Sequence, residues 1–81
     1  MSTNNDANLI RMTNQIAINL GSGRDEDAAA SAICRHLETF WARAMKQRLV
    51  ASLDQADNEL SPLAHRAATL LATRLAERQA S

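Results

Sequence analysis

Proline occurs once and glycine only twice in this 81-residue chain. Both residue types interrupt helices, because glycine is conformationally free and proline fixes φ and lacks a backbone N–H. Gly21 and Gly23 end one predicted helix, and Ser61-Pro62 supplies a cap and a favoured first residue for another. Alanine, leucine and arginine dominate the rest, with few β-branched residues, which favours helix. The sequence therefore predicts an all-α fold.

Apolar residues recur at helical spacing before the glycines and after the proline. The first stripe consists of Leu9, Met12, Ile16 and Leu20. The last stripe consists of Leu63, Ala67, Leu70, Leu71 and Leu75. Each stripe gives its helix one face for a shared core.

The central part of the chain carries two apolar stripes that disagree in phase. The first follows the acidic residues 25–27 and consists of Ala30, Ile33, Cys34, Leu37, Phe40, Trp41 and Ala44. The second consists of Met45, Leu49, Leu53 and Ala56. At about 100° per residue their centres lie about 110° apart, so one straight helix cannot turn both toward one core. We therefore expect a kink or break near residues 42–45, although no proline or glycine occurs there.

These segments predict a single helical domain over residues 7–78, built as a small bundle of three to four helices. Residues 1–6 and 79–81 are expected to be disordered. The chain has one cysteine, so no intramolecular disulfide is available, and no metal-ligand spacing is present. Stability then has to come from helix packing or from a partner chain, because so short a chain buries little surface.

Charge and hydropathy exclude several classes of protein. Nine basic and nine acidic side chains give zero net charge, which argues against a dedicated nucleic-acid binder. No apolar run approaches the roughly 18–20 residues of a membrane span, and the N-terminus lacks the basic and apolar blocks of a secretory signal. We therefore expect no nucleic-acid or membrane partner and, with a lone cysteine, a cytoplasmic location.

No set of residues in the sequence indicates catalysis. Cys34 and His36 are two residues apart on a helix, so they face different directions and cannot bind one metal ion. Cys34 is interpreted as a small core residue. No nucleophile elbow and no glycine-rich phosphate loop occurs. We expect no catalytic, metal-binding or cofactor-binding residue in this chain.

The stretch ETFWARAMKQRL, residues 38–49, contains the only phenylalanine and the only tryptophan. Phe40 is predicted to anchor inward, with Trp41 at the edge of the apolar stripe. Tryptophan and arginine are enriched at interface hot spots, so the candidate partner-binding residues are Trp41, Arg43, Lys46 and Arg48. The alternatives are a plain solvated face, or a small DNA-binding or regulatory helical domain. A helix-turn-helix would require a glycine-bearing turn that this stretch lacks.

Four short motifs resemble the delta subunit of cytoplasmic, NAD-dependent, molybdenum-containing formate dehydrogenases. They are LIRMTNQIA at 9–17, HLETFW at 36–41, Met45-Lys46 with Leu49, and LSPL at 60–63. The family usually has Asp-Pro after Phe-Trp, where this chain has Ala42-Arg43. We expect the break to persist without that proline.

The resemblance implies a small, helical, non-catalytic accessory subunit that docks on the large catalytic subunit. The complex would carry a molybdenum bis-guanine-dinucleotide cofactor, iron–sulfur clusters, FMN and NAD, none of them bound by this chain. Assembly, cofactor insertion and stability of the large subunit remain open as its main role. A permanent subunit and a transient chaperone also remain open.

Overall fold

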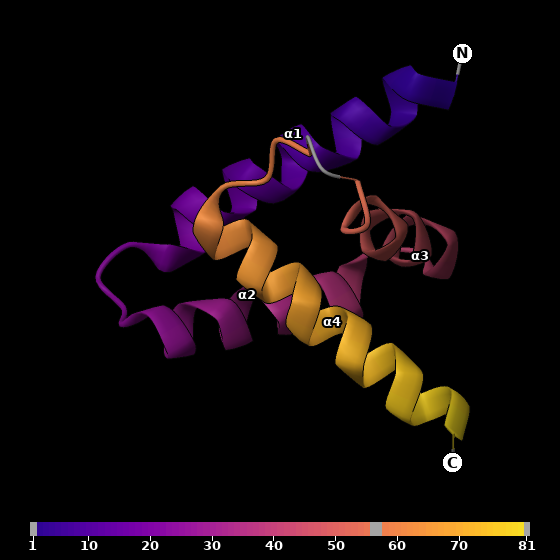
Figure 1. Ribbon diagram of the computed structural model, residues 1–81. Coiled ribbons are helices and arrows are strands. Elements are labelled where there is room, and N and C mark those ends of the chain that lie inside the picture. The colour runs from indigo at the N-terminus through magenta and orange to yellow at the C-terminus, as the bar shows by residue number, and fades with distance from the viewer. Residues whose placement is uncertain (1, 56–57, 81) are drawn as a thin grey trace.

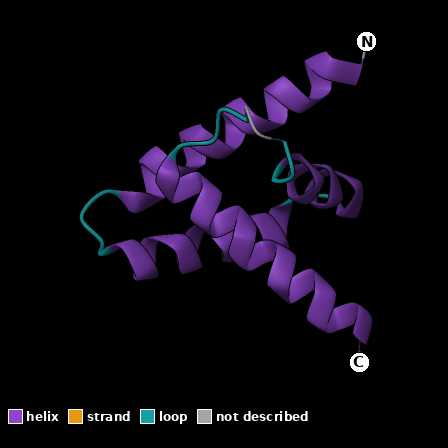
Figure 2. Cartoon of the chain, in the orientation of Figure 1, coloured by secondary structure: helices purple, strands orange, loops and turns teal. Residues whose placement is uncertain are grey.

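The computed structural model describes residues 2–55 and 58–80. Within them the chain forms four helices and no strand: α1 (Ser2–Gly21), α2 (Glu26–Phe40), α3 (Arg43–Ser52) and α4 (Pro62–Ala80) (Figures 1 and 2). The prediction of a small all-α bundle is confirmed. Helix α1 begins before, and helix α4 ends after, the expected domain of residues 7–78. Residues 1–6 and 79–81 were expected to be disordered, and of these Met1 and Ser81 lie outside the described residues.

The helices are arranged around the contact between α2 and α4. Helices α1 and α2 form a V joined by a short loop, and α4 crosses this pair diagonally (Figure 1). Helix α3 lies near the open side of the V and contacts both α1 and α4. The two ends of the chain leave the bundle on the side where α3 lies (Figure 1).

Local side-chain chemistry explains where the helices begin and end. The Asp25 carboxylate caps α2 by accepting a hydrogen bond from the backbone N–H of Ala28 at 2.8 Å. The Ser61 hydroxyl accepts from the N–H of Ala64 at 3.2 Å, just before Pro62 begins α4. After α1, Gly23 adopts a φ of 78°, the left-handed region that glycine enters without strain. The boundaries at Gly23 and Ser61 agree with the sequence analysis.

Small side chains fill much of the core. The fully or nearly buried residues of α4 are Ala64, Ala67, Ala68 and Leu71. They pack against a face of α2 made of Ala29, Ala30, Ile33, Cys34 and Leu37. Short side chains on both helices allow a close approach of the backbones, so this pair forms the centre of the bundle.

The core face of α1 differs from the predicted stripe. Met12 is 43% exposed, whereas Thr13 is fully buried between Leu9 and Ala17. Thr13 tolerates burial because its hydroxyl donates to the Leu9 carbonyl at 2.7 Å, one turn earlier. The core face of α1 is therefore rotated by one residue, and Met12 reaches the surface.

A single side chain of α1 holds the connection between α3 and α4. The Asn14 amide nitrogen donates to the Glu59 carbonyl at 2.9 Å, and its oxygen accepts from the Ser61 N–H at 2.8 Å. These two bonds satisfy backbone groups that no helix or strand satisfies. The N-terminus of α4 is thereby fixed against α1.

The expected break is present at Trp41 and Ala42. Trp41 has φ −91° and ψ 141°, and Ala42 has φ −64° and ψ 153°, both extended. Helix α3 then begins at Arg43, so the break lies at the upstream edge of the predicted 42–45 region. It persists without proline, as expected.

Candidate functional site

The two aromatic residues occupy positions opposite to those predicted. Trp41 is buried, with 8% of its surface exposed, and belongs to the core cluster. Phe40 is 71% exposed, and its ring lies 4.8 Å from the ring of His36, one turn earlier. The prediction of an inward Phe40 and an edge Trp41 assumed that the helix continues through both. Because α2 ends at Phe40, the extended backbone at Trp41 redirects the indole into the core.

The three basic residues among the partner-binding candidates are divided between the two sides of α3. Arg48 lines a groove between α1 and α3, and Arg43 and Lys46 line a cleft between α3 and α4. Arg43 and Arg48 are exposed, but Lys46 is 92% buried by the packing of its long stem, with 8% of its surface exposed. Most of the Lys46 side chain is therefore covered by this chain itself, which leaves little of it for a partner to contact.

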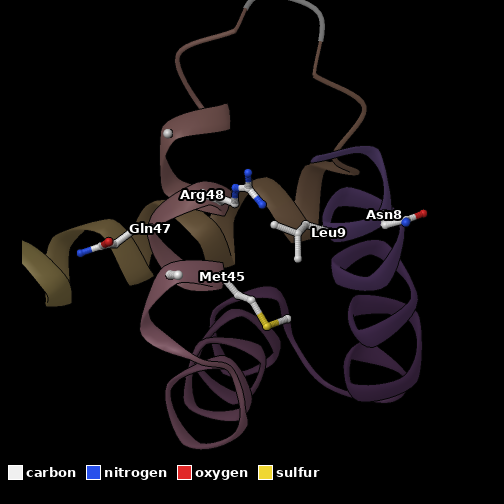
Figure 3. A pocket seen from close by; sticks show the side chains of 7 residues that line it. Asn8, Leu9, Met45, Gln47 and Arg48 are labelled. Atoms are coloured by element: carbon white, nitrogen blue, oxygen red, sulfur yellow. The ribbon is translucent and has the colours of Figure 1, made fainter. Parts of the chain in front are cut away.

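The groove between α1 and α3 has a volume of about 550 Å³. Its lining is largely apolar and consists of Asn8, Leu9, Ala44, Met45, Gln47, Arg48 and Ala51. Figure 3 shows Leu9 and Met45 pointing into the space between the helices, with Arg48 reaching toward Leu9. Asn8 and Gln47 point away from that space (Figure 3). The space between the helices is therefore occupied by Leu9, Met45 and the guanidinium of Arg48, and the amide side chains lie outside it (Figure 3).

Glu38 of α2 contacts α4 through its carboxylate and α3 through its backbone carbonyl. Its carboxylate lies 2.9 Å from the Arg74 guanidinium and 3.1 Å from that of Arg78, both on α4. Only 11% of the Glu38 side chain is exposed, so these ion pairs are better shielded from water than ordinary surface pairs. The pairs fix α4 against the C-terminal half of α2.

Lys46 of α3 caps the C-terminus of α2 with a hydrogen bond from its side chain. Its amine donates to the backbone carbonyl of Glu38 at 3.4 Å. The last carbonyls of a helix lack partners within the helix and carry partial negative charge, and the last turn of α2 contains no basic residue of its own. Lys46 therefore has a structural role at the break between α2 and α3.

Cys34 is fully buried in the core, which confirms its interpretation as a packed thiol. Burial raises the pKa of the Cys34 thiol, and the nearby Glu38 carboxylate raises it further. The thiol sulfur lies 3.9 Å from that carboxylate. A raised pKa disfavours the nucleophilic thiolate, so the geometry gives Cys34 low reactivity. Among residues 2–55 and 58–80, no three histidine, cysteine, aspartate or glutamate side chains are placed to hold a metal ion.

Comparison with known proteins identifies the family. Residues 8–68 match the family model described as the NADH-dependent formate dehydrogenase delta subunit, FdsD. The chain belongs to this family. The match covers α1 from Asn8, all of α2 and α3, and the first turns of α4. No curated protein and no solved structure gave a significant match.

The ion pairs between α2 and α4 of this delta subunit were not identified from the sequence. Neither Arg74 and Arg78 nor their ion-pair partner Glu38 was predicted as a site residue. Their pairing depends on the register between α2 and α4, which no pattern in a single sequence specifies. A sequence signal did exist in the spacing of Arg74 and Arg78, which places both on one helix face.

Over the described residues, no helix has the length and apolar character that a membrane crossing requires.

Proposed function

We propose that this chain is a non-catalytic subunit that docks on the large catalytic subunit of an NADH-dependent formate dehydrogenase. It would support assembly, cofactor insertion or stability of that subunit in the cytoplasm. The family match over residues 8–68 carries the proposal, because it places the chain in a family of formate dehydrogenase delta subunits. On this proposal the molybdenum cofactor, iron–sulfur clusters, FMN and NAD are held by the other subunits.

The exposed Phe40 ring supports docking through the corner between α2 and α3. Within the part of the chain that the structure describes, the large exposed apolar side chains are Met12, Ile18 and Phe40, and Phe40 is the largest of them. A partner that covers the Phe40 ring would bury a large apolar surface, which is the usual way an aromatic anchor contributes to binding. Its contact with His36 limits the freedom of the ring and lowers the entropic cost of binding.

The test is purification of the complex with and without this chain. Molybdenum content and formate oxidation per molybdenum should be measured on both preparations. We expect loss of the chain to lower the amount of loaded large subunit while turnover per molybdenum stays unchanged. A large fall in turnover per molybdenum, with cofactor content and subunit composition unchanged, would contradict a non-catalytic role.

Substitution of Phe40 tests the docking surface. Phe40→Ala should lower the amount of delta subunit that co-purifies with the large subunit, and Ile18→Ala is the matched control because Ile18 is 66% exposed on α1. Equal retention of the two variants would show that Phe40 does not belong to the interface.

Stoichiometric retention of the wild-type chain in mature, cofactor-loaded enzyme would indicate a permanent subunit. Its loss on maturation would indicate a chaperone.

A further inference from the structure

Two adjacent clefts near the C-terminal end of α2 each have three cations among their six lining residues. The first is lined by Arg35, Glu38, Thr39, Arg74, Glu77 and Arg78. The second is lined by Arg43, Lys46, Gln47, Leu75, Arg78 and Gln79. Arg78 belongs to both clefts, so they form one surface. We name its cations, Arg35, Arg43, Lys46, Arg74 and Arg78, the basic corner.

The zero net charge of the chain conceals a separation of charge along α2. The carboxylates of Glu26 and Asp27 lie at the N-terminal end of α2 and pair with Arg66 there. The basic corner lies toward the other end of this 15-residue helix. Its nearest member, Arg35, is about 12 Å from Asp27 along the axis, at about 1.5 Å per residue. Because charges are screened over about 8 Å at physiological salt, the acidic end does not neutralise the basic corner.

The carboxylates within the corner do not balance its cations. Among the residues that the structure describes, Glu38 and Glu77 are the acidic residues that line the two clefts. The Glu38 carboxylate is shared between Arg74 and Arg78, and Lys46 bonds only a neutral carbonyl of Glu38. Arg43 is exposed and makes no ion pair with any residue that the structure describes. The corner therefore keeps an excess of positive charge, with the Arg43 guanidinium available to an anion.

We infer that the basic corner binds an acidic segment of a partner polypeptide within the formate dehydrogenase complex. This inference rests on the proposed function and adds to it the chemistry of the partner surface. The guanidinium of Arg43 has the planar fork that matches a carboxylate in two parallel hydrogen bonds. Gln47 and Gln79 supply neutral amide donors along the same cleft. A short acidic segment complements the cations that line the two clefts.

The test uses complex purified without its delta subunit and immobilised, with wild-type and variant delta subunits in solution. Arg43→Glu reverses the charge at one position of the basic corner. A glutamate at the first position of α3 suits the helix dipole, so the variant should fold. Arg24→Glu is the matched control, because Arg24 is an exposed cation in the loop before α2. We expect Arg43→Glu to weaken binding by at least about tenfold at low salt and less at high salt. Arg24→Glu should change it by less than about twofold.

The outcomes distinguish this inference from the proposed function. Failure of the wild-type chain to bind the delta-free complex would overturn the proposed function. Wild-type binding that Arg43→Glu leaves unchanged, or that both variants weaken equally, would overturn the basic corner while leaving the subunit role intact. Circular dichroism of each variant verifies the fold. Salt-sensitive binding of the wild-type chain to duplex DNA that Arg43→Glu abolishes would instead assign the corner to a nucleic acid and overturn the inference.

Discussion

Phe40 and Trp41 are consecutive residues with opposite environments: 71% of Phe40 is exposed and only 8% of Trp41. The helical backbone of α2 ends between them. The Trp41 N–H still donates to the Leu37 carbonyl at 3.0 Å, but its own ψ of 141° turns the chain away from the helix axis. One change in backbone conformation therefore separates a core anchor from a surface aromatic.

This separation predicts different effects of truncating the two rings. Trp41→Ala should lower the free energy of unfolding by about 3–5 kcal/mol, because it leaves a large cavity in a small core. That loss is a large fraction of the stability of a small domain. Phe40→Ala should lower it by less than about 1 kcal/mol, because the ring is mostly hydrated already. Urea denaturation followed by circular dichroism measures both values. Similar losses in the two variants would contradict the assigned environments.

The ion pairs of Glu38 predict a measurable contribution to the packing of α4. Glu38→Gln keeps the shape of the side chain but removes the charge that binds Arg74 and Arg78. We expect the free energy of unfolding to fall by about 1–2 kcal/mol, reduced from a fully buried value because Arg78 is 65% exposed. Glu77→Gln on the exposed side of α4 is the control and should have little effect. A Glu38→Gln variant as stable as wild type would show that the pairs are fully screened by water.

The start of α3 predicts a stabilising substitution. Ala42 is the N-cap of α3 and its side chain makes no capping hydrogen bond. Ala42→Ser should raise the free energy of unfolding by about 1 kcal/mol, because the hydroxyl can accept from a free N–H in the first turn. Ala44→Ser, two residues into the same helix, is the matched control and should not stabilise. Thermal melts of the two variants beside wild type provide the measurement, and equal melting temperatures would contradict a capping effect.

The break before α3 could be predicted although no proline marks it. The Asp-Pro that the resembled family usually has at the break would supply an N-cap and a first helical residue for α3. The mismatch in phase between the stripes on either side of the break was enough to locate it. Packing of Trp41 and the Lys46 bond to the end of α2 stabilise the break in their place.

The surface was harder to predict than the fold, for identifiable physical reasons. Whether a segment forms a helix depends on its own composition and on the residues at its ends. Asp25 and Ser61 cap helix starts and Gly23 follows a helix end, and each acts on residues close to it in the chain. The exposure of Met12 and Phe40 depends instead on how far each neighbouring helix extends and on its rotation. Glu38 and Arg74 are 36 residues apart in the chain, so only the packing of α2 on α4 brings them together.

Burial of Cys34 predicts low reactivity and a specific dependence of stability on pH. The native thiol should react slowly with a thiol reagent such as iodoacetamide and quickly after denaturation. Cys34→Ala should cost about 1–2 kcal/mol of stability and leave binding to the large subunit intact. Loss of function in a folded, binding-competent Cys34→Ala variant would instead indicate a redox or ligand role.

The sign of the pH effect follows from the raised pKa of the native Cys34 thiol. Below the ordinary cysteine pKa of about 8.5, native and unfolded chains both hold the proton, so the thiol contributes no pH dependence. Above that pH the unfolded chain releases its proton while the native chain retains it. The free energy of unfolding should therefore fall as the pH rises above about 8.5, until the native thiol also ionises. Urea denaturation at a series of pH values measures this slope, and Cys34→Ala should lack the cysteine part of it. Parallel curves for the two proteins would show that the native thiol titrates as it does in the unfolded chain.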